Sequence, residues 1–179
     1  MGYPVFASGD VLNASDMNAV GLWLIKSQTV GTAVASVTLT SVFSSSYENY
    51  LIQYNGGVGS TAQSIALQFG PSSVSGYNTS YYQILSYGTY ATGALTTTNV
   101  NNGTSWTYVG ESSTNWNSVN ILVQSPNLAK YSTVHGGYAG TVGGWVTGYH
   151  GSTGQFTQFT LTVAGTMTGG TIRVYGMRN

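Results

Sequence analysis

The chain has 179 residues, enough for one sizeable domain or for one domain with an arm. Charged residues make up 4% of it, aromatic residues 13%, and the formal net charge is zero. The scarcity of charge excludes the basic surface typical of nucleic-acid-binding proteins, and no apolar run is long enough for membrane insertion. The lack of cysteine excludes disulfides, thiol catalysis and cysteine-based metal sites.

The first 26 residues follow a different pattern from the rest of the chain and are interpreted as an arm, 1–26. Their beginning is extended, and then Met17, Val20 and Leu24 recur at the three- and four-residue spacing of one helix face. This spacing predicts one short helix over 16–25. Such an arm either plugs the open end of a sheet or docks into a partner or a sister chain.

From residue 27 onward the apolar residues alternate with a period of two, which is typical of half-buried β-strands; in the run 64–69, Ile65, Leu67 and Phe69 are expected to point inward. Clusters of Asn, Gly, Ser and Pro separate these runs, as turns do. The spacing predicts an all-β domain over 27–179, a jelly-roll-like antiparallel β-sandwich preceded by the arm. Two glycine-rich stretches, 88–102 and 138–154, are expected to be long loops or ragged edge strands. The predicted strands span 34–40, 49–54, 64–69, 81–87, 104–109, 119–124, 131–138, 144–149, 156–163 and 171–176.

Few titratable groups are available for catalysis. Glu48 and Glu111 could together hydrolyse a glycosidic bond, but nothing in the sequence brings them into proximity. His135 and His150 lack acidic neighbours in sequence that would complete a zinc site, although one histidine per chain could form a ring around a threefold axis. We therefore expect no enzyme activity, no catalytic or metal-binding residue and no cofactor.

The aromatic residues are the strongest indication of a binding function. Flat rings beside Asn, Ser and Gln suit the recognition of neutral sugars, because stacking and hydrogen bonding need no charge. The alternative is that many of these rings belong to the core or to a subunit interface, as expected for Tyr50, Tyr54 and Tyr175. The candidates for host-surface binding are Tyr81, Tyr90, Trp106, Trp116, Trp145 and Tyr149.

Three segments resemble a known group of proteins. Residues 6–18 read F-A-S-G-D-V-L-N-A-S-D-M-N, which resembles the F-x-x-G-D-V-L-T-A-x-D-x-N start of many bacteriophage tail-fibre and minor virion proteins, with Asn13 in place of the usual Thr. Phe43 together with residues 47–52 is similar to their F-x-x-x-Y-x-N-Y-x-I segment. Residues 165–176 resemble the closing strand of the same small phage proteins.

This resemblance implies a protein on the surface of a phage particle, folded as a jelly roll and assembled as a homotrimer. Its partners would be copies of itself, other virion proteins and a glycan of the host cell surface. The expected role is that of a tail-fibre-like adhesin; the alternatives are a capsid decoration protein and a secreted lectin-like module. Residues of the arm would attach it to the virion: Phe6, Val11, Leu12, Met17, Val20, Trp23 and Leu24.

Overall fold

The structure is a computed structural model that describes residues 21–177. Within this range it contains eleven β-strands and no helix, so the all-β prediction is confirmed, and no helix there is long and apolar enough to cross a membrane. The strands are β1 (Leu22–Thr29), β2 (Val34–Leu39), β3 (Asn49–Gly59), β4 (Gln63–Gly70), β5 (Tyr81–Thr89), β6 (Leu95–Gly103), β7 (Trp106–Ser112), β8 (Asn117–Gln124), β9 (Ser132–Ala139), β10 (Val142–His150) and β11 (Gln158–Met177).

All strand pairs are antiparallel, and part of the sheet closes on itself. The strands β3, β8, β7, β4 and β11 follow one another around a ring, because β3 pairs with both β8 and β11. This ring is a closed barrel with the core inside it. The predicted jelly-roll sandwich is not established by this pairing.

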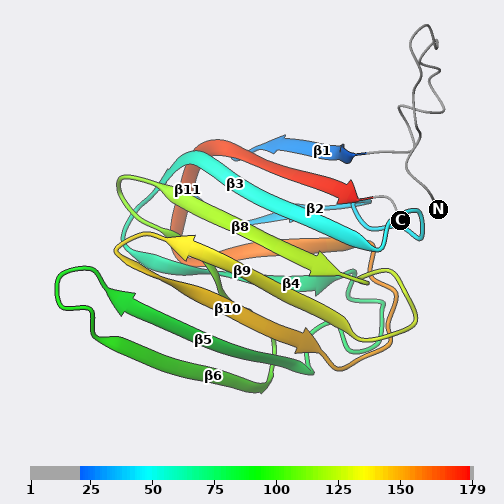
Figure 1. Cartoon of the computed structure of the whole chain (residues 1–179). Coiled ribbons are helices and arrows are strands. Elements are labelled where there is room, and N and C mark those ends of the chain that lie inside the picture. Colours follow the sequence, from blue (N-terminus) through cyan, green and yellow to red (C-terminus); the bar gives the residue numbers. More distant parts are fainter. Residues whose placement is uncertain (1–20, 178–179) are drawn as a thin grey trace, which may run out of the picture.

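The strands form two layers of unequal width (Figure 1). We call the wider one the front layer; it runs in the order β1, second half of β11, β3, β8, β9, β10, β5, β6. Behind it lie β2, the first half of β11, β4 and β7. The front layer therefore extends beyond the barrel, and its β5–β6 hairpin lies at the far margin.

The last strand, β11, is longer than the sequence predicted. The two predicted strands 156–163 and 171–176 are joined into one strand that runs through both layers. Gly169 and Gly170 have φ of 66° and 77°, values that few residues other than glycine adopt. A Cβ on Gly170 would lie 2.4 Å from the Gly57 backbone nitrogen, so the close approach of β11 to β3 also requires glycine there.

The helix predicted over 16–25 is wrong for the residues that the structure describes. Leu22–Thr29 is strand β1, which pairs with the end of β11 so that Leu24 lies opposite Tyr175. A short apolar run fits both periods, and the free edge of β11 decides between them by supplying hydrogen-bond partners. The rest of the predicted helix lies outside the described residues, and the boundary at residues 26/27 falls inside β1.

Along several strands every second residue is apolar and points into the core, as expected from the sequence. The predicted inward residues Ile65, Leu67 and Phe69 are almost wholly buried. At the centre, Phe69 packs edge-on against Trp106 at 5.0 Å between ring centroids and stacks on Phe156 at 4.8 Å. Burying one such ring contributes roughly 1.5–3 kcal/mol, so this cluster is a large part of what holds the layers together.

Candidate functional site

Most large apolar side chains that are exposed lie on one side of the front layer, the side that faces away from the barrel. We call this the outer face. The pairing registers align a row of outward residues across the strands, from Ile84 on β5 through Thr147 and His135 to Leu122, and on to Leu24 on β1. Its exposed apolar residues are Leu22, Leu24, Ile84, Leu95, Trp145 and Tyr149.

Three tyrosines form a stacked ladder at one end of this face. Tyr82 on β5 and Tyr149 on β10 lie directly opposite each other, with ring centroids 4.6 Å apart and an interplanar angle of 9°. Tyr131, just before β9, stacks on Tyr149 at 6.0 Å and 18°. Tyr131 and Tyr149 remain 57% and 41% exposed. The ladder therefore presents aromatic surface to solvent in an ordered arrangement.

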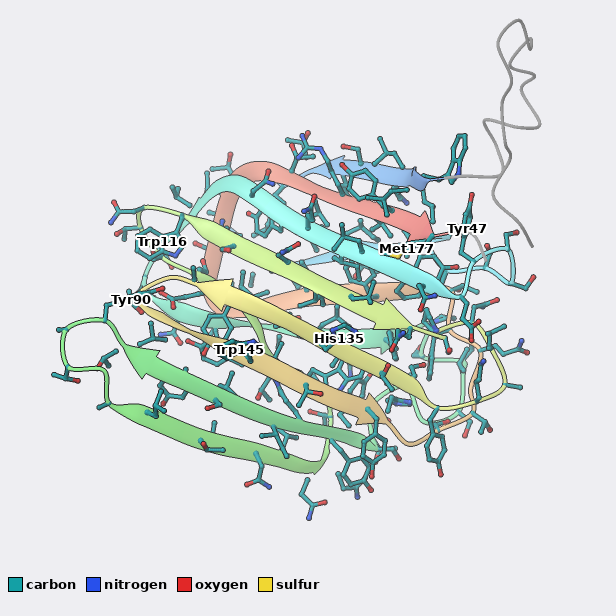
Figure 2. All side chains as sticks on the ribbon, viewed as in Figure 1. Tyr47, Tyr90, Trp116, His135, Trp145 and Met177 are labelled. Carbon is teal, nitrogen blue, oxygen red and sulfur yellow. The ribbon has the colours of Figure 1, made fainter. Side chains whose placement is uncertain are left out.

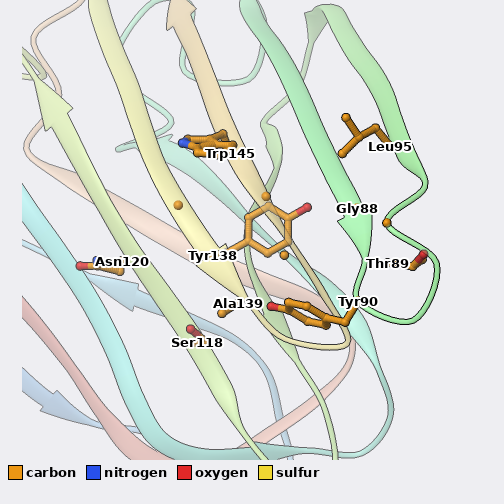
Figure 3. Close-up of a pocket in the computed structure, with 13 residues that line it drawn as sticks. Gly88, Thr89, Tyr90, Leu95, Ser118, Asn120, Tyr138, Ala139 and Trp145 are labelled. Atoms are coloured by element: carbon orange, nitrogen blue, oxygen red, sulfur yellow. The ribbon is translucent and has the colours of Figure 1, made fainter.

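At the opposite end of β10 a hollow of about 770 Å³ lies over glycines, and we call it the glycine hollow (Figure 3). Gly88, Gly137 and Gly143 contribute its floor, on three neighbouring strands. Trp145 stands at its side and is 72% exposed, because its cross-strand neighbours are Ser86 and Gly137. Side chains would fill this space if the floor carried them, so glycine creates the hollow. Tyr90 and Leu95 complete the wall.

A second hollow of about 790 Å³ lies beside the tyrosine ladder. Its lining combines Tyr82, Tyr149 and Ile84 with the amides of Asn99, Asn101 and Gln124. His135, exposed on β9 and visible on the outer face in Figure 2, is the one titratable side chain besides tyrosine among the residues lining either hollow. Both hollows thus offer aromatic faces, amides and hydroxyls without an acidic or strongly basic group.

Two of the aromatic residues predicted to bind a host surface are in the core instead. Tyr81 and Trp106 have no exposed surface. The Tyr81 hydroxyl accepts a hydrogen bond from the Phe69 amide at 2.6 Å and donates one to the Tyr77 carbonyl, while burial raises the Tyr81 pKa. The Trp106 indole donates to the Tyr82 carbonyl at 3.3 Å. Both side chains point into the core and cannot contact a ligand, so this part of the prediction is wrong.

The remaining candidates are found in different surroundings. Trp145 and Tyr149 lie on the outer face, and Tyr90, 68% exposed, projects from the β5–β6 turn. Trp116 is half-buried in the β7–β8 turn. Figure 2 shows Tyr90 and Trp116 toward the same end of the molecule.

Two of the predicted attachment residues lie on β1, and they have different exposure. Leu24 is 54% exposed on the outer face, whereas Trp23 is half-buried opposite Gly176. The other predicted attachment residues lie outside the described residues: Phe6, Val11, Leu12, Met17 and Val20.

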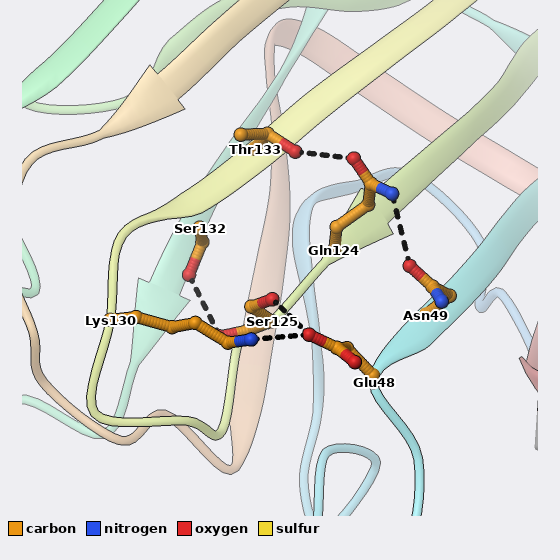
Figure 4. Close-up of polar contacts among 7 residues, drawn as sticks. All are labelled: Glu48, Asn49, Gln124, Ser125, Lys130, Ser132 and Thr133. Atoms are coloured by element: carbon orange, nitrogen blue, oxygen red, sulfur yellow. Dashed lines mark hydrogen bonds and ion pairs between the residues drawn. The ribbon is translucent and has the colours of Figure 1, made fainter. Parts of the chain in front are cut away.

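The carboxylates Glu48 and Glu111 are not brought together. Glu48 lies beside the end of β8, where Lys130 and the Ser125 hydroxyl donate to its carboxylate (Figure 4). Glu111 pairs with Ser118 near the start of β8. Ser118 and Ser125 are seven positions apart along extended chain, about 23 Å, far beyond the spacing of a glycosidase carboxylate pair.

Glu111 itself is buried under the β9–β10 turn. Its Oε1 accepts a hydrogen bond from the Thr141 amide at 2.9 Å, and a Cβ on Gly140 would lie 2.4 Å from its Oε2. Burial, with a smaller effect of the Glu111 charge, raises the pKa of the neighbouring Tyr108 to about 12. The carboxylate is thus enclosed by the fold and does not line either hollow.

The two histidines lie on opposite sides of the front layer. His150 is fully buried; its Nε2 bonds the Gly76 carbonyl at 2.8 Å and its Nδ1 accepts from the Ser152 amide. Burial lowers the pKa of His150, which keeps the ring neutral. Within residues 21–177, no three His, Asp or Glu side chains gather in a way that could hold a metal ion.

Sequence reasoning did not select Tyr82, Tyr131, Ile84 or Leu95 as site residues. Alternation places Tyr82 and Tyr81 on opposite sides of one strand, but it does not say which side faces the core. The glycines of the glycine hollow look like turn residues in the sequence, since their role depends on three strands lying side by side.

Comparisons of the chain with protein-family models, with curated proteins and with solved structures find no match.

Proposed function

We propose that this protein is a structural protein of a bacteriophage virion, a tail-fibre-like adhesin that is attached by its N-terminal arm. In this proposal the outer face binds a neutral saccharide on the host cell. The observation that supports binding is the combination of exposed aromatic rings and uncharged amides on one continuous face. Sugar rings stack on aromatic faces, and amides bind their hydroxyls, so this chemistry suits a neutral glycan.

The two ends of the face are well spaced for an extended ligand. Tyr149 and Trp145 are four residues apart on β10 and point to the same side. A strand rises about 3.3 Å per residue, so these rings are about 13 Å apart. A short oligosaccharide could therefore contact the tyrosine ladder and the glycine hollow together, with Thr147 and Ile84 between them.

The virion assignment rests on the segments that resemble phage proteins. Two of these segments are neighbours in space, since Tyr50 pairs with Gly176 and the ring of Tyr47 packs over Gly176. A Cβ on Gly176 would lie 2.6 Å from the Tyr47 ring, which explains glycine at this point of the closing strand. The homotrimer and the jelly-roll topology implied by the resemblance belong to this proposal.

Binding to a panel of immobilised neutral and anionic oligosaccharides tests the adhesin role. We expect binding to neutral members, weakened about tenfold or more by Trp145→Ala or Tyr149→Ala, since each removes one stacking surface. Thr162→Ala is the matched control, because Thr162 is exposed on the layer behind. Selective binding to anionic members, or neutral binding that both aromatic substitutions leave unchanged, would contradict the proposal.

The virion location is tested with the intact particle. Mass spectrometry of purified particles should detect the protein at a copy number that matches the tail. Removing residues 1–20 should prevent incorporation while leaving β1 and the domain folded, since β1 begins at Leu22. A copy number that matches the capsid lattice, together with no saccharide binding, would favour the decoration-protein alternative.

A further inference from the structure

Three of the described strands have an edge without a partner strand: β1, β2 and β6. Free edges carry unpaired backbone groups, and natural proteins usually protect them with charge, bulges, proline or short length. In β1 the register shifts between Leu24 and Lys26, and the Lys26 ammonium donates to the Thr40 carbonyl at 2.8 Å. β2 has only six residues. Both edges therefore carry a recognised form of protection.

The β6 edge lacks these features over most of its length. It has nine residues, L-T-T-T-N-V-N-N-G, with no charged residue and no proline. From Leu95 to Val100 its register with β5 is regular, and the shift comes only beyond Val100, near Asn102, where φ is 55°. Its first five residues are all exposed, so neither of its sides is covered by another layer. Figure 1 shows β6 at the outer margin of the front layer.

We propose that β6 pairs edge to edge, antiparallel, with β6 of a second copy of this chain. A free strand is complementary in hydrogen bonding to another free strand. A second copy presents the same uncharged edge, so pairing neither buries an unpaired charge nor places like charges opposite each other. Threonine and valine favour extended backbone, and cross-strand threonine pairs are stabilising.

This pairing has a geometric consequence. Two antiparallel edge strands of one sheet are related by a twofold axis normal to the sheet, so the two front layers form one continuous sheet. Side chains of the two outer faces then point to the same side. If the proposed function is correct, the pair presents two saccharide-binding faces to one host surface, which raises avidity without any new contact to the ligand.

Sedimentation velocity of the full chain over a range of concentrations tests the pairing. We expect a reversible dimer, or a hexamer if the homotrimer also forms, because a twofold contact gives even numbers of copies. Thr97→Lys, at an exposed position in the regular part of β6, should weaken the twofold association about tenfold or more, since a lysine on an edge opposes strand pairing. Thr29→Lys on β1 is the matched control and should leave the association unchanged.

Amide hydrogen exchange gives a second measurement. The β6 amides should become protected as the concentration rises, whereas those of β2 should not change. A monomer or a trimer at every concentration would overturn the proposal, as would an even-numbered assembly that Thr97→Lys does not weaken. Circular dichroism confirms that each variant is folded. If β6 does not pair, a monomer can still bind the saccharide through its outer face. The outcome of the pairing experiment therefore does not decide the proposed function.

Discussion

Strands β5 and β10 carry large apolar and aromatic residues on both of their sides, but those on the inner side are buried and those on the outer side are accessible to solvent. The inner side has Tyr81, Val146 and His150, all buried; the outer side has Tyr82, Trp145 and Tyr149, all partly or mostly exposed. On the inner side the rings of His150 and Tyr81 meet edge to face, with their centroids 4.5 Å apart and an interplanar angle of 71°. Outside, the tyrosines stack face to face and leave surface open. An aromatic residue in this protein therefore belongs to the core or to the candidate site according to its side of the strand.

The largest difference between the two sides should appear in tryptophan truncations. Trp106→Ala should lower the free energy of unfolding by about 3–5 kcal/mol, because it opens a cavity among Phe69, Tyr81 and the Tyr82 carbonyl. Trp145→Ala should change it by no more than about 0.5 kcal/mol, since its ring is exposed. Denaturant unfolding measures both, and equal losses would show that Trp145 also supports the core.

Replacing a glycine by alanine on the inner or the outer side should produce a smaller difference in the free energy of unfolding. A Cβ on Gly148 would lie 2.3 Å from the Tyr82 carbonyl oxygen, so Gly148→Ala should cost about 1–3 kcal/mol through forced backbone movement. The atom nearest to a Cβ on Gly137 would be the Gly144 carbonyl oxygen, at 3.6 Å, which is an ordinary van der Waals contact. Gly137→Ala should therefore be neutral or stabilise the strand by up to about 1 kcal/mol. Thermal unfolding of both variants checks the contrast, and similar destabilisation would contradict it.

The smallest expected effect is on the pH dependence of stability. Burial lowers the pKa of His150 below its ordinary value of 6.5. As the pH falls below 6.5, His150 takes up a proton in the unfolded chain but stays neutral in the folded protein. The free energy of unfolding therefore decreases as the pH falls below 6.5. Melting temperatures between about pH 7.5 and pH 5 should show this decline.

The two histidines supply the control for this pH effect. His150→Gln should remove the decline, whereas His135→Gln, on the exposed outer side, should keep it. If His135→Gln removed the decline instead, the buried ring would not be its source.

Much of the core could be predicted from alternation alone. Ile65, Leu67 and Phe69 were expected to point inward and do so, because every second residue of a half-buried strand is apolar. Where large residues follow one another, as at Tyr81 and Tyr82, the pattern is ambiguous. Choosing the inner member then depends on the strands that lie beside β5.

Other elements depended on distant parts of the chain. The apolar run at the start of β1 is also compatible with a helix, and it forms a strand because the edge of β11 supplies hydrogen-bond partners. The strand β6 lies in the stretch 88–102, for which the sequence left a loop and a ragged edge strand open, and its pairing with β5 makes it an edge strand. Neither outcome could be derived from local propensity.

The amino-acid sequence by itself determined that this protein would be a β-protein with an almost uncharged surface, because strand-forming residues, turn residues and few charged groups are properties of the composition. Only the tertiary structure decided which aromatic residues are buried, since the side of a strand that faces the core depends on its neighbours. It also decided that three glycines would form the floor of the glycine hollow beside Trp145, because they come together only where β5, β9 and β10 lie side by side.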